Sequence, residues 1–375
     1  MGSLEETYVH DAFAQNWIST VGPNLEAFEA SFSKLMGGLP CVALASGTAA
    51  IHLGLKLLGI KPGDEVLCPS LTFSASCNPI VYEHAKPVFL DSERKTWNLD
   101  PALLDDVLAK KAKAGKLPRA LVLVHLYGQS ADLDPIEAIC AKHGVPILED
   151  AAEALGTLYK GHQVGPRSPV SIFSFNGNKI ITTSGGGMLV AQDKKLVDKA
   201  RFWSTQAREP SIAYEHKEIG FNYRLSNVLA GIGRGQLVVL EDRVAARRAV
   251  FARYAEAFAD LPLEGMPEMP NTRHTRWLSV FLAETTTQRD AIIEALAKDD
   301  IEARPVWKPM HLQPVYVSAE RAGGDVSEDL FARGVCLPSS SSLSADDQAR
   351  VIEVVRRTLR PRVQASPRKE SPCET

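Results

Sequence analysis

Short apolar runs alternate with amphipathic stretches along the first half of the chain. Five such runs fall between residues 41 and 150: CVALAS, EVLCPS, KPVFLDS, RALVLVHLYG and VPILED. Stretches with apolar residues at helical spacing separate them, the first being GTAAIHLGLKLLGI. Continuous Val, Ile and Leu runs joined by helices are typical of a parallel sheet that helices cover on both faces. We therefore predict a doubly wound α/β domain with a mostly parallel sheet.

Two more apolar runs, SPVSIFSF and GGMLVAQD, follow the fifth. They predict two strands that close the sheet and are joined like a hairpin. The connection between them, NGNKIITTSG, carries Lys179 at the end of an apolar run, where a solvated charge is unexpected.

The pattern changes beyond about Leu225, where a long helix-rich stretch begins. The runs WLSVFLAE and EARPVW and the helical pattern SADDQARVIEVVRRTL come after it, which indicates a smaller α+β domain. A chain of 375 residues is also too long for one ordinary core. We expect an N-terminal arm and a large α/β domain over 1–240, and a small C-terminal domain over 241–360. The polar tail, 361–375, is expected to be disordered.

Composition narrows the classes of function. Hydrophobic residues make up 45% of the chain and charged residues 23%, and the net charge of −3 gives no basic footprint for nucleic acid. The sequence contains no apolar run of membrane-spanning length and no signal-peptide pattern at its start. Six cysteines without CxxC spacing and nine histidines without HExxH spacing argue against a metal site. They favour a reduced, cytoplasmic protein.

Candidate ligand-binding residues follow the predicted strands, because ligands collect at the carboxyl ends of strands in α/β sheets. Gly47 and Thr48 lie where the first strand leads into a helix, as an ordinary helix cap or as a phosphate site. Phe73 follows the second strand and either packs in the core or stacks on a flat ring. The chain has neither a Walker loop nor GxGxxG, which weakens readings as an ATPase or a NAD-dependent oxidoreductase.

Asp150 and Lys179 complete this set. Asp150 ends the strand VPILED, where a carboxylate either caps the next helix or holds a proton on a heteroaromatic nitrogen. Lys179 is a surface charge or, if desolvated, an amine with a lowered pKa that attacks carbonyls. A phosphate cradle, a stacking ring, a carboxylate and an amine together match the needs of pyridoxal 5′-phosphate.

Five segments in order carry a family resemblance: SGTAAIHLGL, GDEVLCPSLTFSAS, EDAAEALGT, SFNGNK with GGG, and GFNYRLSN. They resemble the sugar aminotransferases of the DegT/DnrJ/EryC1/StrS family over nearly the whole chain. The resemblance implies the fold type I architecture of pyridoxal phosphate-dependent transferases, similar to aspartate aminotransferase. It also implies pyridoxal 5′-phosphate as cofactor and a homodimer with active sites at the subunit interface.

The resemblance implies roles for four residues around the aldehyde and the ring of the cofactor. Lys179 stands where the family has the lysine that forms a Schiff base with the cofactor, and Asp150 where a carboxylate pairs with the pyridine nitrogen. Phe73 stands at the ring-stacking position. Glu153 occupies a position near the ring where relatives carry His, Gln or Glu. Because some relatives with histidine in place of the lysine are sugar dehydratases, Lys179 implies transamination.

The phosphate end is assigned in the same way. Gly47, Thr48 and Ser174 fall at phosphate contacts, and Asn222 matches an asparagine that reaches the phosphate from the neighbouring subunit. The chain departs from the family at 184–187, which read Ser-Gly-Gly-Gly where many relatives read Gly-Glu-Gly-Gly.

Within the family, the chain looks most like the bacillosamine-pathway branch. That likeness implies transfer of the amino group of L-glutamate to C4 of a UDP-linked 4-keto-6-deoxy-N-acetylhexosamine. Arg224, Trp307, Lys308 and His311 lie in segments that could meet the nucleotide-sugar, although packing, solvation or ion pairing explains them equally well. GDP-perosamine synthesis and C3 amination of a sugar are the alternatives. A non-catalytic, cofactor-binding regulatory protein is the alternative from another class.

Overall fold

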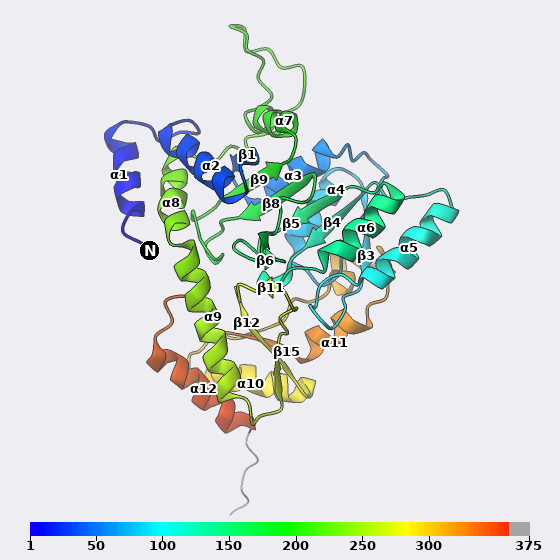
Figure 1. Cartoon of the computed structure of the whole chain (residues 1–375), viewed down its shortest axis with the longest axis vertical. Helices are drawn as coiled ribbons and strands as arrows, with labels where there is room; N and C mark the ends of the chain where they lie inside the picture. The colour runs from blue at the N-terminus through cyan, green and yellow to red at the C-terminus, as the bar shows by residue number, and fades with distance from the viewer. Residues whose placement is uncertain (360–375) are drawn as a thin grey trace, which may run out of the picture.

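The computed structural model describes residues 1–359 and contains one large mixed sheet (Figure 1). Its strand order is β1-β9-β8-β5-β4-β2-β3-β14. The strands are β1 (Cys41–Leu44), β2 (Glu65–Pro69), β3 (Lys86–Leu90), β4 (Ala120–Val124), β5 (Ile147–Asp150), β8 (Val170–Ser174), β9 (Gly187–Ala191) and β14 (Glu320–Ala322). All neighbours pair in parallel except β9, which is antiparallel to both β1 and β8. The predicted mostly parallel sheet is confirmed.

Helices cover both faces of this sheet. They are α1 (Glu5–Ala14), α2 (Pro23–Leu35), α3 (Gly47–Leu57), α4 (Asn78–Tyr82), α5 (Pro101–Lys113), α6 (Leu133–His143), α7 (Lys194–Ser204) and α8 (Asn227–Val238). Neighbouring residues of one strand enter different cores: Leu121 of β4 belongs to one buried cluster and Val122 to the other. Since successive strand residues point to opposite faces, a strand buried on both faces must be apolar throughout. This explains the continuous apolar runs in the sequence.

The hairpin predicted after β5 is present. β8 and β9 pair from Val170 with Ala191 to Ser174 with Gly187. The connection between them therefore starts and ends at the same edge of the sheet, and it carries Lys179 there.

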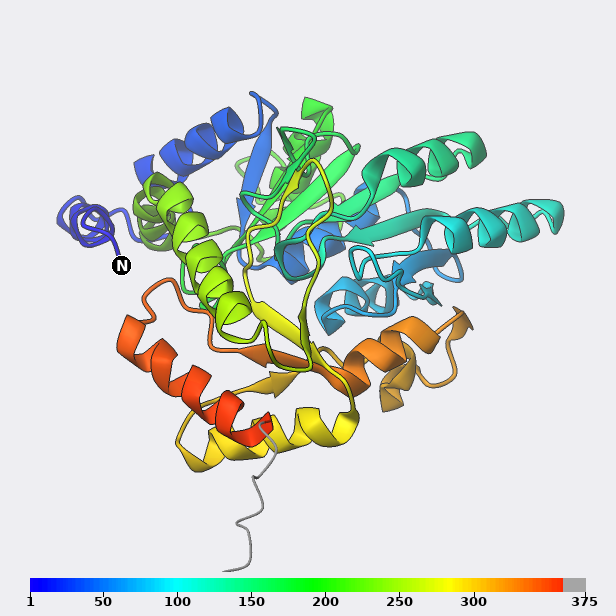
Figure 2. The same ribbon diagram turned by 60° about the horizontal axis from the view of Figure 1, so that its bottom comes forward.

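A second, four-stranded sheet lies beyond the long helix α9 (Leu240–Ala257), as Figure 2 shows with its strands in yellow and orange. Its order is β10 (Leu263–Gly265), β12 (Ser279–Ala283), β15 (Gly334–Leu337) and β13 (Arg304–Pro305). The helices α10 (Thr286–Lys298), α11 (Asp325–Arg333) and α12 (Ala345–Leu359) accompany it. Short 3-10 turns complete the chain: η1 (Ser74–Ser76), η2 (Leu126–Gly128), η3 (Met310–Leu312) and η4 (Pro314–Tyr316).

The two halves of the chain interlock. β14 joins the large sheet beside β3, and β11 (Thr272–Arg273) pairs with β6 (Leu158–Tyr159), which pairs in turn with β7 (His162–Gln163). Strands from beyond residue 240 thus pair with strands from the first half of the chain. The predicted domain boundary at residue 240 stays a prediction. The tail predicted to be disordered, 361–375, lies outside the described residues.

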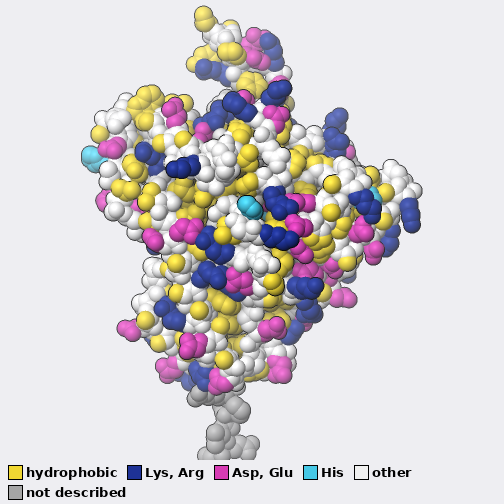
Figure 3. Space-filling view, in the orientation of Figure 1, with side chains coloured by type: hydrophobic (Ala, Val, Ile, Leu, Met, Phe, Trp, Pro, Cys, Tyr) yellow, Lys and Arg dark blue, Asp and Glu magenta, His cyan; other side chains and the backbone are white. Residues whose placement is uncertain are grey.

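A long loop leaves the body of the molecule between α7 and α8, at the top of Figure 1. Apolar side chains near its tip are exposed: Ile212, Tyr214 and Ile219. On the face drawn in Figure 3, basic and acidic side chains are interspersed below this loop. Across residues 1–359, no helix is long and apolar enough to cross a membrane.

Candidate active site

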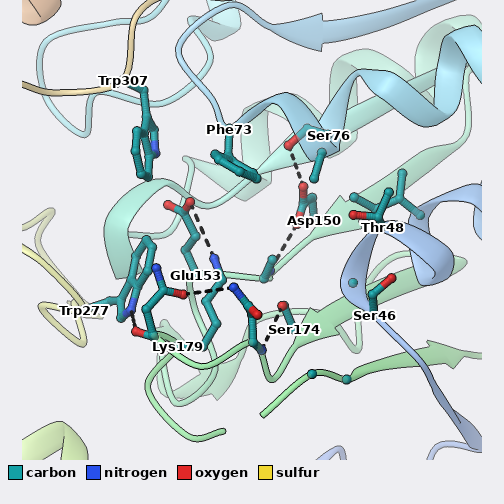
Figure 4. A pocket seen from close by; sticks show the side chains of 18 residues that line it. Ser46, Thr48, Phe73, Ser76, Asp150, Glu153, Ser174, Lys179, Trp277 and Trp307 are labelled. Carbon is teal, nitrogen blue, oxygen red and sulfur yellow. Dashed lines mark hydrogen bonds and ion pairs between the residues drawn. The ribbon is translucent and has the colours of Figure 1, made fainter. Parts of the chain in front are cut away.

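A cavity of about 290 Å³ opens at the carboxyl ends of the central strands (Figure 4). Its wall is built by the start of α3, the turn η1, the end of β5, the segment after β8, and two tryptophans from the second half of the chain. The predicted cofactor residues that line it are Gly47, Thr48, Phe73, Asp150, Glu153, Ser174 and Lys179. The fold therefore brings together side chains that are up to 132 residues apart, from 47 to 179.

The start of α3 forms the anion-binding end of the cavity. Ser46 caps the helix by accepting a hydrogen bond of 3.0 Å from the N–H of Ala49. A Cβ atom on Gly47 would lie 2.9 Å from the Cβ of Ser174, so glycine is needed for β8 to approach the helix. Free N–H groups at a helix start, beside the hydroxyls of Thr48 and Ser174, suit a phosphate group. The capping and phosphate interpretations of this turn are thus compatible.

Asp150 is buried, and its carboxylate is held from two sides. The hydroxyl of Ser76 donates a hydrogen bond of 2.6 Å to Oδ2, and the N–H of Ala152 donates one of 3.1 Å to Oδ1. Thr72 lies behind Ser76, with the two hydroxyl oxygens 2.8 Å apart. These bonds orient the carboxylate in the cavity, where it suits a protonated ring nitrogen.

Lys179 lies at the floor of the cavity with its side chain 12% exposed. Its Nζ is 3.8 Å from Oε1 of Glu153. Burial lowers the pKa of Lys179 and raises the pKa of Glu153. The N–H of Tyr127 donates a hydrogen bond of 2.7 Å to Oε2 of Glu153, which fixes this carboxyl group next to the amine. A lysine with a lowered pKa supplies the neutral amine that reacts with a carbonyl.

The glycines after Lys179 leave room for neighbouring atoms that a Cβ atom would clash with. A Cβ atom on Gly187 would lie 2.4 Å from the carbonyl oxygen of Ser46, and one on Gly186 would lie 2.3 Å from Oγ1 of Thr183. Only glycine therefore lets β9 start against the turn between β1 and α3. Ser184 adopts a φ of 69° in this connection and is exposed, so the serine that departs from the family pattern lies at a strained surface turn.

Aromatic rings line the side of the cavity away from α3. Phe73 is half exposed, and its ring centroid is 5.6 Å from that of Trp307. Tyr127 lies behind, 5.7 Å from Trp307 and 6.3 Å from Trp277. Phe73 thus offers a ring face at the mouth of the cavity, where a flat ring could stack on it.

The four predicted substrate residues have different surroundings. Trp307 lines the cavity and Lys308 is exposed. His311 is buried, with its ring nitrogens 2.6 Å from Oγ of Ser70 and 2.9 Å from Oε1 of Glu328. Its polar atoms are thus engaged within the fold.

Arg224, the fourth predicted substrate residue, and Asn222 also lie outside the cavity. Arg224 donates hydrogen bonds of 2.5 Å to Glu29 and 2.8 Å to the carbonyl of Ala43. Ion pairing within the fold therefore accounts for its charge. Asn222 forms an isolated β-bridge with Thr205 at the base of the long loop. Its contact with a second subunit stays a prediction.

Ser76 and Trp277 are among the cavity residues that were not singled out from the sequence. Ser76 stands in a stretch of small hydroxyl residues after β2, and only knowledge of the Asp150 position could have selected it. Trp277 is 98 residues beyond Lys179 and precedes β12 of the second sheet. No local spacing points from one to the other.

Comparisons with known proteins agree with this geometry. The family model described as the DegT/DnrJ/EryC1/StrS aminotransferase family matches residues 1–356. The chain is 50% identical over 360 residues to the putative pyridoxal phosphate-dependent aminotransferase EpsN of Bacillus subtilis, covering 95% of this chain and 93% of that protein. It is 38% identical to a GDP-perosamine synthase of Caulobacter vibrioides, with 95% of both chains covered.

Solved structures give the same result. A DegT DnrJ EryC1 StrS aminotransferase from Brucella abortus superposes with a TM-score of 0.88 at 30% identity, over 94% of each chain. The aminotransferase TlmJ from Streptoalloteichus hindustanus gives a TM-score of 0.87 at 29% identity, over 96% of each chain. These matches confirm the fold type I architecture and favour an enzyme over a non-catalytic regulatory protein. The chain belongs to the DegT/DnrJ/EryC1/StrS aminotransferase family and is a pyridoxal phosphate-dependent aminotransferase.

Proposed function

We propose that the enzyme moves the amino group of L-glutamate to C4 of a nucleotide-linked 4-keto-6-deoxy sugar, with Lys179 and Asp150 as its catalytic residues. The observation that carries this proposal is the shared cavity, in which a buried amine, an oriented carboxylate and a helix start face one another. This set has one member for each of three polar parts of pyridoxal phosphate: the aldehyde, the ring nitrogen and the phosphate. When bound, the cofactor supplies an electron sink for the electron pair left behind when a proton leaves the substrate carbon.

The residues of the cavity would bind the cofactor, orient it and move protons. Lys179 would hold the cofactor between turnovers and, once free, would take a proton from the amino-acid carbon and return it one atom away. Asp150 would keep a proton on the ring nitrogen, and the hydrogen bond from Ser76 fixes the carboxylate for that task. The start of α3 and Ser174 would position the phosphate, and Phe73 would cover one ring face. The same groups would serve both halves of the reaction, first with glutamate and then with the sugar ketone.

The sugar that we propose is UDP-linked 2-acetamido-2,6-dideoxy-hexos-4-ulose. The motifs around Lys179 and the segment that contains Trp307 support this choice through their likeness to the bacillosamine branch. Synthesis of GDP-perosamine is the second candidate, and it is supported by relatives with that name in Caulobacter vibrioides and in Escherichia coli O157:H7, at 38% and 36% identity. C3 amination of a related sugar is the third.

Product analysis separates these candidates. The purified enzyme with bound cofactor is incubated with L-glutamate and one keto-sugar at a time, linked to UDP, GDP or dTDP, and each product is examined by NMR. We expect an amine on C4 and the highest kcat/KM with the UDP-sugar. A preference for the GDP-sugar would select the second candidate, and an amine on C3 the third.

We also propose that the enzyme is a cytoplasmic homodimer in which Asn222 completes the partner's site. Exposed apolar side chains support this. They are Phe13, Trp17, Ile18 and Val21 near the N-terminus and Ile212, Tyr214 and Ile219 on the long loop. Monomers rarely expose so many large apolar groups, and a second copy would cover them. The loop also holds Asn222 at its base, so a partner that covers the loop would lie near this residue.

A further inference from the structure

The amine of Lys179 lies between two groups that come from different parts of the chain. On one side is the carboxyl group of Glu153, 3.8 Å from Nζ. On the other is the face of Trp277, whose ring centroid is 4.1 Å from Nζ. A cation at this distance from an indole face is attracted by the negative charge density of the ring. Figure 4 shows both the Glu153 carboxyl group and the Trp277 ring near the lysine side chain.

Trp277 also holds the backbone next to this lysine. Its indole N–H donates a hydrogen bond of 2.8 Å to the carbonyl of Asn178, the residue before Lys179. The side chain itself is held firmly, being 1% exposed, and its own carbonyl accepts a hydrogen bond from the guanidinium of Arg247. One residue therefore contacts both the backbone carbonyl just before Lys179 and the amine at the end of the lysine side chain.

We propose that Trp277 is a positioning residue for Lys179, with its ring face as the resting place of the amine whenever the amine is not joined to the cofactor. This inference rests on the proposed role of Lys179. During transamination the lysine is released from the cofactor and must stay close to it, in a fixed place, to carry protons. The indole face holds the released amine close to the cofactor. The hydrogen bond to the carbonyl of Asn178 fixes the backbone at the base of the lysine side chain.

The ring face has a second effect on the same amine. Burial disfavours the ammonium form of Lys179, whereas the indole face favours it. A group that must both accept and donate a proton works best when its pKa is near the working pH. Trp277 therefore offsets part of the effect of burial and keeps the protonated form accessible. A tryptophan that only filled space would leave the protonation of Lys179 unchanged.

The protonation of Lys179 can be measured in the cofactor-free protein. Acetic anhydride acetylates neutral amines, so the extent of labelling of the peptide that contains Lys179, followed by mass spectrometry across pH, gives the midpoint of its titration. We expect Trp277→Leu to lower this midpoint by about one pH unit, the size of a buried cation–π contact. Trp277→Phe keeps a ring face and should retain most of the wild-type value. Trp203→Phe, at a tryptophan that does not line the cavity, is the matched control.

Fluorinated tryptophan gives a test that does not depend on the stability of the leucine variant. The chain has five tryptophans, and within residues 1–359 the amine of Lys179 lies over the ring of Trp277. Fluorine withdraws charge density from the ring while it preserves the N–H group and nearly the same shape. The Lys179 midpoint should fall stepwise with each added fluorine in the wild-type chain and stay constant in Trp277→Phe.

The outcome separates this inference from the proposed function. An unchanged or raised midpoint in both the leucine and the fluorinated proteins would overturn the role of Trp277. Reduction of the holoenzyme with borohydride, followed by peptide mapping, tests Lys179 itself. If the cofactor maps to another lysine, the proposed function fails, whatever Trp277 does to the Lys179 midpoint.

Discussion

The hydroxyl of Ser76 donates a hydrogen bond of 2.6 Å to Oδ2 of Asp150, and both residues line the same cavity. Hydrogen bonds to a charged acceptor are short and strong, so this contact orients the carboxylate. Since Thr72 approaches the same hydroxyl at 2.8 Å, Ser76 is itself held in place.

Ser76→Ala should therefore slow catalysis without unfolding the protein. Loss of a charge-assisted hydrogen bond worth about 1.5–3 kcal/mol corresponds to a decrease in kcat of roughly 10- to 100-fold. Steady-state kinetics with glutamate measure the effect, and circular dichroism checks the fold. Ser74→Ala, two residues away in the same turn, is the control. Equal kcat values for the two variants would show that Ser76 does not support Asp150.

Arg224 is expected to matter for stability. Its side chain and that of Glu29 are 8% and 12% exposed, and they form an ion pair inside the fold. Arg201 also pairs with Glu29, at 2.9 Å, and keeps its charge compensated when Arg224 is removed. Arg224→Ala should therefore lower the free energy of unfolding by about 1.5–3 kcal/mol, the value of a hydrogen bond between charged groups. Urea denaturation measures this.

The matched control for Arg224 is the exposed pair of Arg304 and Glu302, whose side chains are 73% and 72% exposed. Arg304→Ala should cost less than about 1 kcal/mol, because solvent screens such pairs. A stable Arg224→Ala protein with a raised KM for the keto-sugar would instead support a substrate contact.

Buried His274 should make the protein sensitive to mild acid. Burial, followed by the nearby charges of Arg276 and Arg248, lowers its pKa well below 6.5. Its Nδ1 accepts a hydrogen bond of 2.9 Å from the N–H of Arg276, next to Trp277. Because the unfolded chain binds this proton more readily than the folded one, stability is lost as pH falls below about 6.5, by up to about 1.4 kcal/mol per pH unit.

The substitution His274→Asn tests this origin of the pH dependence. The difference in free energy of unfolding between wild type and variant, measured in the cofactor-free protein, should decrease from pH 7 to pH 5. The same substitution at exposed His10 on α1 is the control. A difference that does not vary with pH would assign the acid sensitivity to other groups.

Mixing two inactive variants tests the proposed dimer. If each site combines Lys179 of one chain with Asn222 of the other, a dimer of Lys179→Ala and Asn222→Ala chains has one intact site. Activity should then return when the two proteins are unfolded together and refolded, up to about a quarter of wild type for random pairing. Each variant refolded alone is the control. Mixtures that stay inactive, although mixed dimers form, would place Asn222 in its own chain's site or outside both.

The sequence predicted the large sheet well, because its strands are buried on both faces and so appear as unbroken apolar runs. The positions of Asp150, at the end of β5, and of Lys179, in the connection that follows β8, fit the same reasoning, because ligands bind at the carboxyl ends of the strands. Trp277 could not be found in this way. It reaches the cavity through the packing of the second half of the chain against the first, and that packing leaves no periodic signal.

Charged residues near the site show the same limit. Arg224 stands in a family motif, yet its guanidinium is bound to Glu29, a residue 195 positions away. His311 is likewise occupied by Ser70 and Glu328. Whether a charged side chain binds a ligand or forms an ion pair within the protein depends on which residues the fold brings next to it. A single sequence does not show this.

The central claim is that the cavity holds the cofactor on Lys179. The most direct test is reduction of the holoenzyme with borohydride, which fixes the cofactor to the amine that carries it, followed by peptide mapping by mass spectrometry. We expect one modified site, Lys179, and loss of that modification when glutamate is added before the reductant, because the amino group has then moved to the cofactor. Modification of a different lysine, or a label on Lys179 that glutamate does not remove, would contradict it.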